Sequence, residues 1–289
     1  MPTDTPSFLV CGGCHLDRHL HLHDTPVMGR TNPAASQVGV GGVAANIARH
    51  LAARGGNVRF VGVQPPAELA QMEGRLRASG VTPYLLPLDG DAPDYTAILT
   101  EEGDLLVGAA SMSLYDAVTA DLLLPHLDAV TPLVMDANFP ESVLSASAAS
   151  LDDSRLLCVA ATSEAKVGRL ATCLSRVDAL VLNRGEASGL TPAAPVAEMA
   201  DALAAQLRPG GLVLVSDGAG DAALSSATAS AVARPPPVVL ANANGAGDAM
   251  AAALFWGLVA APDAGLASRL DQALSAGAAF AAGQRTEPF

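Results

Sequence analysis

The chain has 289 residues, of which 50% are hydrophobic and 16% charged, and this composition excludes a disordered protein. Its 16 basic and 29 acidic residues give a formal net charge of −13, which repels phosphate backbones and argues against a nucleic-acid partner. The start of the chain does not read as a signal peptide. Charged residues also interrupt the Ala-rich stretches 245–264 and 265–283, so neither offers the roughly 20 apolar residues of a membrane span. We therefore expect a soluble, cytoplasmic protein with no membrane partner.

Short apolar segments alternate along the chain with longer segments of helical spacing. The expected strands are Phe8–Gly12, Val58–Val63, Pro132–Met135, Leu156–Val159, Ala179–Leu182 and Leu212–Ser216. The expected helices include Ala44–Arg54, Ala67–Ala78, Thr119–Leu127 and Val196–Leu207. Strands that alternate with helices predict an α/β fold with a doubly wound, mostly parallel sheet that is covered by helices on both faces.

Two segments, at about 15–40 and 81–110, depart from this alternation. They contain no good helix, and turn residues such as Asp89-Gly90 separate short stretches that are polar at alternate positions. We expect these segments to form a small β-sheet that projects from the main sheet as a lid over a site. The whole chain, residues 1–289, is then one domain with the lid segments inserted in it.

The most informative segment is Gly245-Ala246-Gly247-Asp248, which precedes an apolar run of helical character. Free N–H groups and the helix dipole make a helix N-terminus a site for anions. A carboxylate beside a bound phosphate suits a general base that takes a proton from an attacking hydroxyl. The alternative is that the four residues only start a helix with an acidic first turn.

Four motifs in order show that the chain resembles the ribokinase-like (PfkB) family of carbohydrate and nucleoside kinases over nearly its whole length. The family's closing signature corresponds to Gly245–Asp248. Its opening Gly-Gly pair, with an Asn on the helix that follows, corresponds to Gly41–Asn46. The early Gly-Gly-x-x-x-Asp corresponds to Gly12–Asp17, and Asn-x-x-Glu corresponds to Asn183–Glu186. The resemblance implies the ribokinase-like fold and ATP-dependent phosphorylation of a sugar or nucleoside, with Mg²⁺ as cofactor.

The resemblance also implies a role for each matching position. Asp248 would deprotonate the substrate hydroxyl, and the amides of Gly245, Ala246 and Gly247 would stabilise the transferred phosphoryl group. The residues implied to hold the substrate are Asp17, Asn32, Gly41, Gly42 and Asn46. The residues implied to bind the nucleotide are Asn183, Glu186, Ser216, Gly218 and Gly220, and Glu186 would also organise the metal, mostly through water.

Within the family, the chain is most similar to the pseudouridine-kinase branch. The segments that carry this similarity are Thr31-Asn32-Pro33 ahead of Gly41–Val43, Asp136-Ala137-Asn138, Thr162–Lys166, Asn183–Ala187 and Asn242. This similarity implies phosphorylation of the 5′-hydroxyl of pseudouridine and, by analogy with the family, a homodimer formed through the lid sheet. Two alternatives stay open: a kinase for another nucleoside or a ribose-like sugar, and a non-catalytic protein that binds a sugar or nucleoside.

Three other features allow more than one interpretation. Cys11 and Cys14 have the spacing of redox or zinc sites, but no second pair lies at a suitable distance. The histidines at positions 15, 19, 21 and 23 could hold a metal, although we favour an exposed lid strand with polar side chains on one face. Lys166, the only lysine, could contact phosphate or cap a helix.

Overall fold

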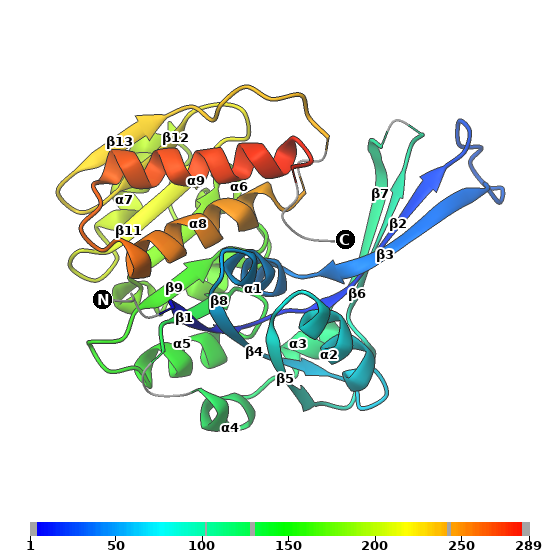
Figure 1. Cartoon of the computed structure of the whole chain (residues 1–289), viewed down its shortest axis with the longest axis horizontal. Helices are drawn as coiled ribbons and strands as arrows, with labels where there is room; N and C mark the ends of the chain where they lie inside the picture. Colours follow the sequence, from blue (N-terminus) through cyan, green and yellow to red (C-terminus); the bar gives the residue numbers. More distant parts are fainter. Residues whose placement is uncertain (1–4, 102, 128–130, 242–243, 285–289) are drawn as a thin grey trace.

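The computed structural model describes residues 5–101, 103–127, 131–241 and 244–284. Most of the chain surrounds a sheet with the strand order β13-β12-β11-β10-β9-β8-β1-β4-β5 (Figure 1). The strands from β11 to β5 are parallel, and β12 and β13 add an antiparallel edge. Their bounds are β1 (Ser7–Cys11), β4 (Asn57–Gln64), β5 (Thr82–Pro87), β8 (Leu133–Asp136), β9 (Leu157–Ala160), β10 (Ala179–Asn183), β11 (Leu212–Ser216), β12 (Ala222–Ser225) and β13 (Ser230–Ala233).

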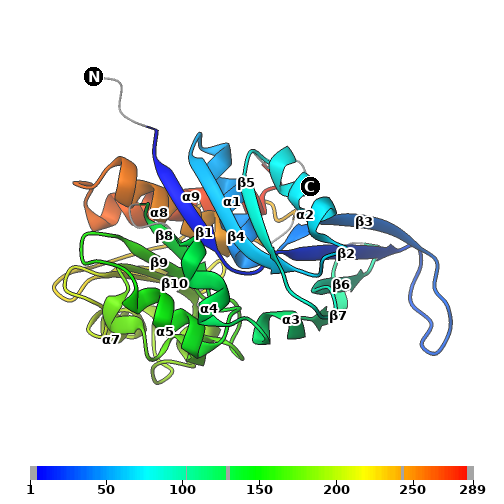
Figure 2. The same cartoon turned by 90° about the horizontal axis from the view of Figure 1, so that it is seen from below.

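Helices cover both faces of this sheet, as the alternation of strands and helices predicts (Figure 2). One apolar core lies under α1 (Val43–Ala53), α2 (Leu69–Ala78), α8 (Ala246–Ala260) and α9 (Leu266–Ala281). The other core lies under α3 (Ser113–Asp116), α4 (Ala120–Leu123), α5 (Glu141–Ala149), α6 (Arg184–Ala187) and α7 (Val196–Ala204). Successive strand side chains enter opposite cores, for example Val10 and Leu9, which explains why the central strands are apolar throughout.

A second, smaller sheet projects from the large one (Figure 1). It has the order β3-β2-β6-β7, and we call it the small sheet. Its strands are β2 (His15–Leu22), β3 (Ala34–Gly41), β6 (Asp94–Leu99) and β7 (Leu105–Ser111). The chain leaves the large sheet after β1, returns at α1, leaves it again after β5, and returns at α3. The small sheet is therefore built from two separate insertions.

Two expectations differ from the structure in detail. Strand β5 lies within the range 81–110 expected for the projecting sheet, but it pairs with β4 at the edge of the large sheet. The expected helix Thr119–Leu127 is shorter, because α4 ends at Leu123 and a 3₁₀ turn over Leu124–His126 follows. Pro125 lacks the amide hydrogen that a continuing α-helix requires. No helix in the described ranges is both long and apolar enough for a transmembrane segment.

Candidate active site

The motifs converge where the parallel strands of the large sheet end. Strand β1 lies between β4 and β8, so the order of connection reverses there. In open α/β sheets, ligands bind at the carboxyl ends of strands beside such a reversal. Gly12 follows β1, and Asp136, Asn183 and Ser216 end β8, β10 and β11. The structure thus brings residues from distant parts of the chain to one edge of the sheet.

Asp248 lies in the first turn of α8 and is bound to α1. The side-chain amide of Asn46 donates a hydrogen bond to Asp248 Oδ2 at 2.8 Å. Burial raises the pKa of Asp248 to about 7, and the charges of Asp136, Glu186 and Asp17 act in the same direction, while the Asn46 hydrogen bond lowers it. Asp248 therefore exchanges a proton near neutral pH, as a general base requires.

The N-terminus of α8 is partly exposed beside Asp248, with Gly247 on the surface. Gly245 precedes the helix with φ of +95°, a left-handed conformation that favours glycine. The N–H groups of the first turn have no acceptor within the helix, so they can bind an anion. A Cβ atom added at Gly247 would meet no atom within 4 Å, which leaves room for a ligand against this turn.

The glycine pair before α1 is required by close contacts. Gly42 has φ of +101°, and a Cβ there would lie 2.4 Å from the carbonyl oxygen of Gly13. A Cβ at Gly41 would lie 2.1 Å from Oδ1 of Asp17. Asp17 also approaches His15, with Nδ1 and Oδ1 at 2.8 Å. The glycines thus let the start of α1, the loop after β1 and Asp17 on β2 come together.

A buried carboxylate that the motif analysis assigned no role organises these segments. Asp136 is fully buried and accepts hydrogen bonds from the backbone N–H groups of Gly13 at 3.1 Å, Ala44 at 3.0 Å and Asn138 at 3.0 Å. The side chain of Asn138 also donates to Asp136 at 2.8 Å. A single acidic residue at the end of an apolar strand was the only local signal for this role.

Asn183 and Glu186 form a capping box at the start of α6. Glu186 Oε2 accepts from the N–H of Asn183, and Asn183 Oδ1 accepts from the N–H of Glu186, both at 2.9 Å. Burial raises the pKa of Glu186, and the charge of Glu164 adds to this shift. A Cβ at Gly185 would lie 2.2 Å from Oε1 of Glu164, so both carboxylates lie beside the same turn.

This turn offers the hard oxygen donors that Mg²⁺ prefers. Glu186 is buried, and no cationic side chain of the described ranges pairs with it. Within these ranges no group of three or more His, Cys, Asp or Glu side chains could hold a metal by itself. Magnesium needs only one or two carboxylates when substrate phosphates and water complete its shell, so Glu186 fits the ion in that mode.

The predicted nucleotide loop lies next to this turn. Asn183 and Ser216 are paired residues of β10 and β11, and Arg184 bonds to Asp217 at 3.0 Å. Gly218 has φ of +56° in the turn that follows, and the N–H of Gly220 donates to the carbonyl of Asp217 at 2.7 Å. Asn242 lies outside the described residues.

One predicted substrate residue stands apart from the others. Asn32 lies in the turn between β2 and β3, where its Oδ1 accepts from the N–H of Val27 and its Nδ2 donates to the carbonyls of Val27 and Arg30. Its side-chain amide is thus used to hold this turn.

The histidines of β2 differ from the expected exposed strand. His15, His19 and His21 share one face of the small sheet with Asp17 because strand side chains alternate. However, His15 is only 9% and His19 only 8% exposed, so these two side chains are buried. His23 follows the end of β2 and is exposed.

The two cysteines of the glycine loop are buried. Burial raises the pKa of the Cys14 thiol to about 12 and that of Cys11 still further. Thiolates are the species that bind zinc and attack disulfides, so this environment opposes both alternatives. Cys14 instead contributes its backbone carbonyl, which accepts from Gln64 at 2.6 Å and from the Tyr115 hydroxyl at 2.8 Å.

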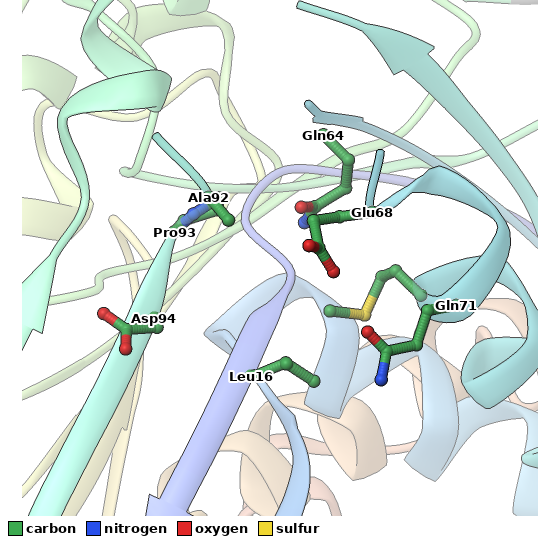
Figure 3. Close-up of a pocket in the computed structure, with 8 residues that line it drawn as sticks. Leu16, Gln64, Glu68, Gln71, Ala92, Pro93 and Asp94 are labelled. Atoms are coloured by element: carbon green, nitrogen blue, oxygen red, sulfur yellow. The ribbon is translucent and has the colours of Figure 1, made fainter. Parts of the chain in front are cut away.

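A cavity of about 170 Å³ lies at the root of the small sheet (Figure 3). Leu16 and Asp94 line it from the paired strands β2 and β6, Gln64 lines it from the end of β4, and Glu68 from the start of α2. Leu16 points to the face of β2 opposite Asp17. The cavity therefore lies on the face of the small sheet opposite Asp17, and none of the predicted site residues lines it.

The raised pKa of Asp248 makes a prediction about stability. Its folded-state pKa of about 7 lies above the value of roughly 3.9 in unfolded chains, so the folded protein loses stability as pH rises through this window. Asp248→Asn should raise the thermal unfolding midpoint clearly more at pH 8, where the whole loss is present, than at pH 5, where only part of it is. Asp271→Asn, at an exposed position of α9, is the control and should show no such dependence. An equal effect of Asp248→Asn at both pH values would contradict the assignment.

Comparisons with known proteins agree with this architecture. The model of the pfkB family of carbohydrate kinases matches residues 23–288. A solved carbohydrate kinase from Agrobacterium tumefaciens shares 29% identity and a TM-score of 0.79, over 97% of this chain and 94% of that chain. Ribokinase from Thermotoga maritima shares 16% identity and a TM-score of 0.80, over 98% and 96%.

Ribokinase from Arabidopsis thaliana, solved with ribose and ATP, shares 18% identity and a TM-score of 0.76, over 98% of this chain and 96% of that chain. No curated protein matches the sequence. The fold is ribokinase-like, and the family model covers nearly the whole chain. The chain therefore belongs to the PfkB family of carbohydrate kinases.

Proposed function

We propose that the protein transfers the γ-phosphoryl group of ATP to the 5′-hydroxyl of pseudouridine, giving pseudouridine 5′-phosphate and ADP. The observation that carries the phosphoryl-transfer part is the position of Asp248, whose pKa is about 7, in the first turn of α8 beside exposed Gly247. The similarity to the pseudouridine-kinase branch supports the choice of acceptor.

Asp248 is the general base of the proposed reaction. It takes the proton of the 5′-hydroxyl as the oxygen attacks the γ-phosphorus, and the bond from this phosphorus to the bridging oxygen of ADP breaks. The N–H groups of Gly245, Ala246 and Gly247 stabilise the charge on the transferred group. Asn46 holds the carboxylate through its 2.8 Å hydrogen bond.

The turn around Asn183 and Glu186, with the neighbouring loop of Ser216, Gly218 and Gly220, holds the nucleotide in this proposal. Glu186 holds Mg²⁺ directly or through water, and the bound ion supplies positive charge against the phosphates. Two solved neighbours are complexes with ATP or ADP. Exposed Val239 and Leu240 precede the α8 turn and give the adenine ring an apolar surface.

The acceptor lies between the start of α1 and the small sheet, held by Asp17, Gly41, Gly42 and Asn46. His15 and His19 share the face of Asp17 on the small sheet, and this face, which we call the acceptor wall, carries their polar groups. Pseudouridine carries one more N–H group on its base than uridine does. The imidazole and carboxylate groups of the acceptor wall can accept a hydrogen bond from this additional N–H group. This favours pseudouridine, because an N–H group that is buried without an acceptor costs binding energy.

A substrate panel tests the proposed function. We expect ATP- and Mg²⁺-dependent ADP release with pseudouridine at a kcat/KM well above that with uridine, adenosine, ribose or fructose. Asp248→Asn should abolish release with pseudouridine and keep its binding, measured by calorimetry. A higher kcat/KM with another acceptor would assign the site to that acceptor. Binding without turnover of any acceptor by the wild type would favour the non-catalytic alternative.

The open space at Gly247 gives a second prediction. Gly247→Ala should leave the fold intact and stabilise α8 by about 0.5 kcal/mol, because the new methyl group meets no protein atom. It should lower kcat by about tenfold or more, because the methyl group occupies the space of the phosphoryl group. Gly257→Ala, in the same helix with only ordinary contacts, is the matched control and should keep full activity. Full activity of Gly247→Ala would place the phosphoryl group elsewhere.

We also propose that two copies pair through their small sheets. Strand β7 forms one edge, and all of its residues are exposed, including Leu105, Leu106 and Val107. An exposed apolar edge strand favours pairing with another strand. Light scattering after size exclusion should show a dimer for the wild type and a monomer for Val107→Lys. A wild-type monomer at micromolar concentration would contradict this proposal.

A further inference from the structure

Lys166 is the only lysine of the chain, and it lies beside the turn that follows β9. Its ammonium donates a hydrogen bond to Oδ1 of Asn138 at 2.7 Å. It also lies 5.6 Å from the centre of the Tyr115 ring, a distance at which a cation is attracted to the ring face. Burial lowers the pKa of Lys166, and the charge of Asp136 opposes this shift.

The bond to Lys166 holds one end of the Asn138 side-chain amide, and Asp136 holds the other. A side-chain amide has an oxygen that accepts and a nitrogen that donates, and these point to opposite sides. With Oδ1 held by Lys166, Nδ2 is directed at Asp136 and donates to it at 2.8 Å. In the reverse orientation the amide oxygen would face the carboxylate, and two acceptors repel each other.

No other described cation can take this role. Arg169 is the other cation bonded to Asn138, but its guanidinium donates to the backbone carbonyl of Asn138 and pairs with Asp116 at 2.8 Å. It leaves the side-chain oxygen of Asn138 to Lys166. Among the described cations, Lys166 is thus the one that holds the amide oxygen, and it fixes the amide orientation together with the Asp136 carboxylate.

The effect of this orientation reaches the acceptor site through Asp136. Asp136 accepts from the N–H groups of Gly13 and Ala44. Gly13 contacts Gly42, whose added Cβ would lie 2.4 Å from the Gly13 carbonyl. Ala44 is in the first turn of α1, and Asn46 in the same helix donates to Asp248. A shift of Asp136 would therefore move the segments that carry the proposed acceptor-binding residues.

We propose that Lys166 is a positioning residue, whose ammonium orients Asn138 so that Asp136 holds the glycine loop and the start of α1 in place for the acceptor. This inference rests on the proposed function, because it takes Gly42 and Asn46 to bind the acceptor. It assigns Lys166 no contact with phosphate.

Site-specific restoration of the ammonium tests the role. The four native cysteines are buried, so Lys166→Cys introduces the one half-exposed thiol. Alkylation with 2-bromoethylamine rebuilds a side chain of lysine length with its ammonium. Alkylation with 1-iodopropane gives the same length with a methyl group instead. Mass spectrometry should confirm a single adduct in each case.

We expect Lys166→Cys to lower kcat/KM for the acceptor by about tenfold or more and to change KM for ATP less than about twofold. The aminoethyl adduct should regain most of the activity, and the propyl adduct should not. Equal recovery by both adducts would show that the side chain only fills space. Wild-type activity of the unmodified variant would also overturn the proposal.

Hydrogen exchange in the absence of ligand separates this inference from the proposed function. In Lys166→Met, the peptides that contain Gly13 and Ala44 should exchange faster than in the wild type, while the remote peptides of α7 stay unchanged. Unchanged exchange at Gly13 and Ala44 would refute the role of Lys166 even if the enzyme phosphorylates pseudouridine. Faster exchange in a protein that phosphorylates no acceptor would refute the proposed function alone.

Discussion

The carboxylate of Asp136 is the group on which the arrangement of the site depends. Removing a charge from water is costly unless hydrogen bonds replace the lost hydration. Three backbone N–H groups and one side-chain amide do so at Asp136, and they come from the loop after β1, from α1 and from the residue two positions after β8. Each donor is held in position because a buried carboxylate without its hydrogen bonds would be destabilised. One buried charge thus joins three segments of the chain. Gly13 lies 123 residues from Asp136 in the sequence, Ala44 lies 92 residues away, and Asn138 lies 2 residues away.

The same charge also acts on Asp248. Asp136, Glu186 and Asp17 each disfavour ionisation of Asp248, in addition to its burial. If these carboxylates raised the pKa of Asp248 far above neutral pH, its side chain would stay protonated and could not accept a proton. The amide of Asn46 limits the rise. The acidic side chains around Asp248 therefore influence its protonation. In the proposed reaction, bound magnesium would offset their negative charge.

The sequence predicted the central strands well because they are buried on both faces and are apolar without interruption. It did not predict β12 and β13, which are short and rich in Ala and Ser. It placed β5 with the small sheet because strand partners depend on tertiary contacts, which a local pattern does not contain. The motif positions Asp17, Gly42, Asn46 and Asp248 do converge. The role of Asp136 could not be predicted, because it arises from amides brought together only by the fold.

The two separate insertions that form the small sheet have a consequence for folding. Strands β2 and β6 pair in parallel, although Leu16 and its partner Asp94 are separated by β3, α1, β4, α2 and β5. Closing so long a loop costs entropy before the pairing returns any energy. The hairpins can meet only after β1, β4 and β5 have brought their ends together. We infer that the small sheet is among the last parts of the protein to form. We also infer that neither the β2–β3 hairpin nor the β6–β7 hairpin keeps its shape as an isolated fragment.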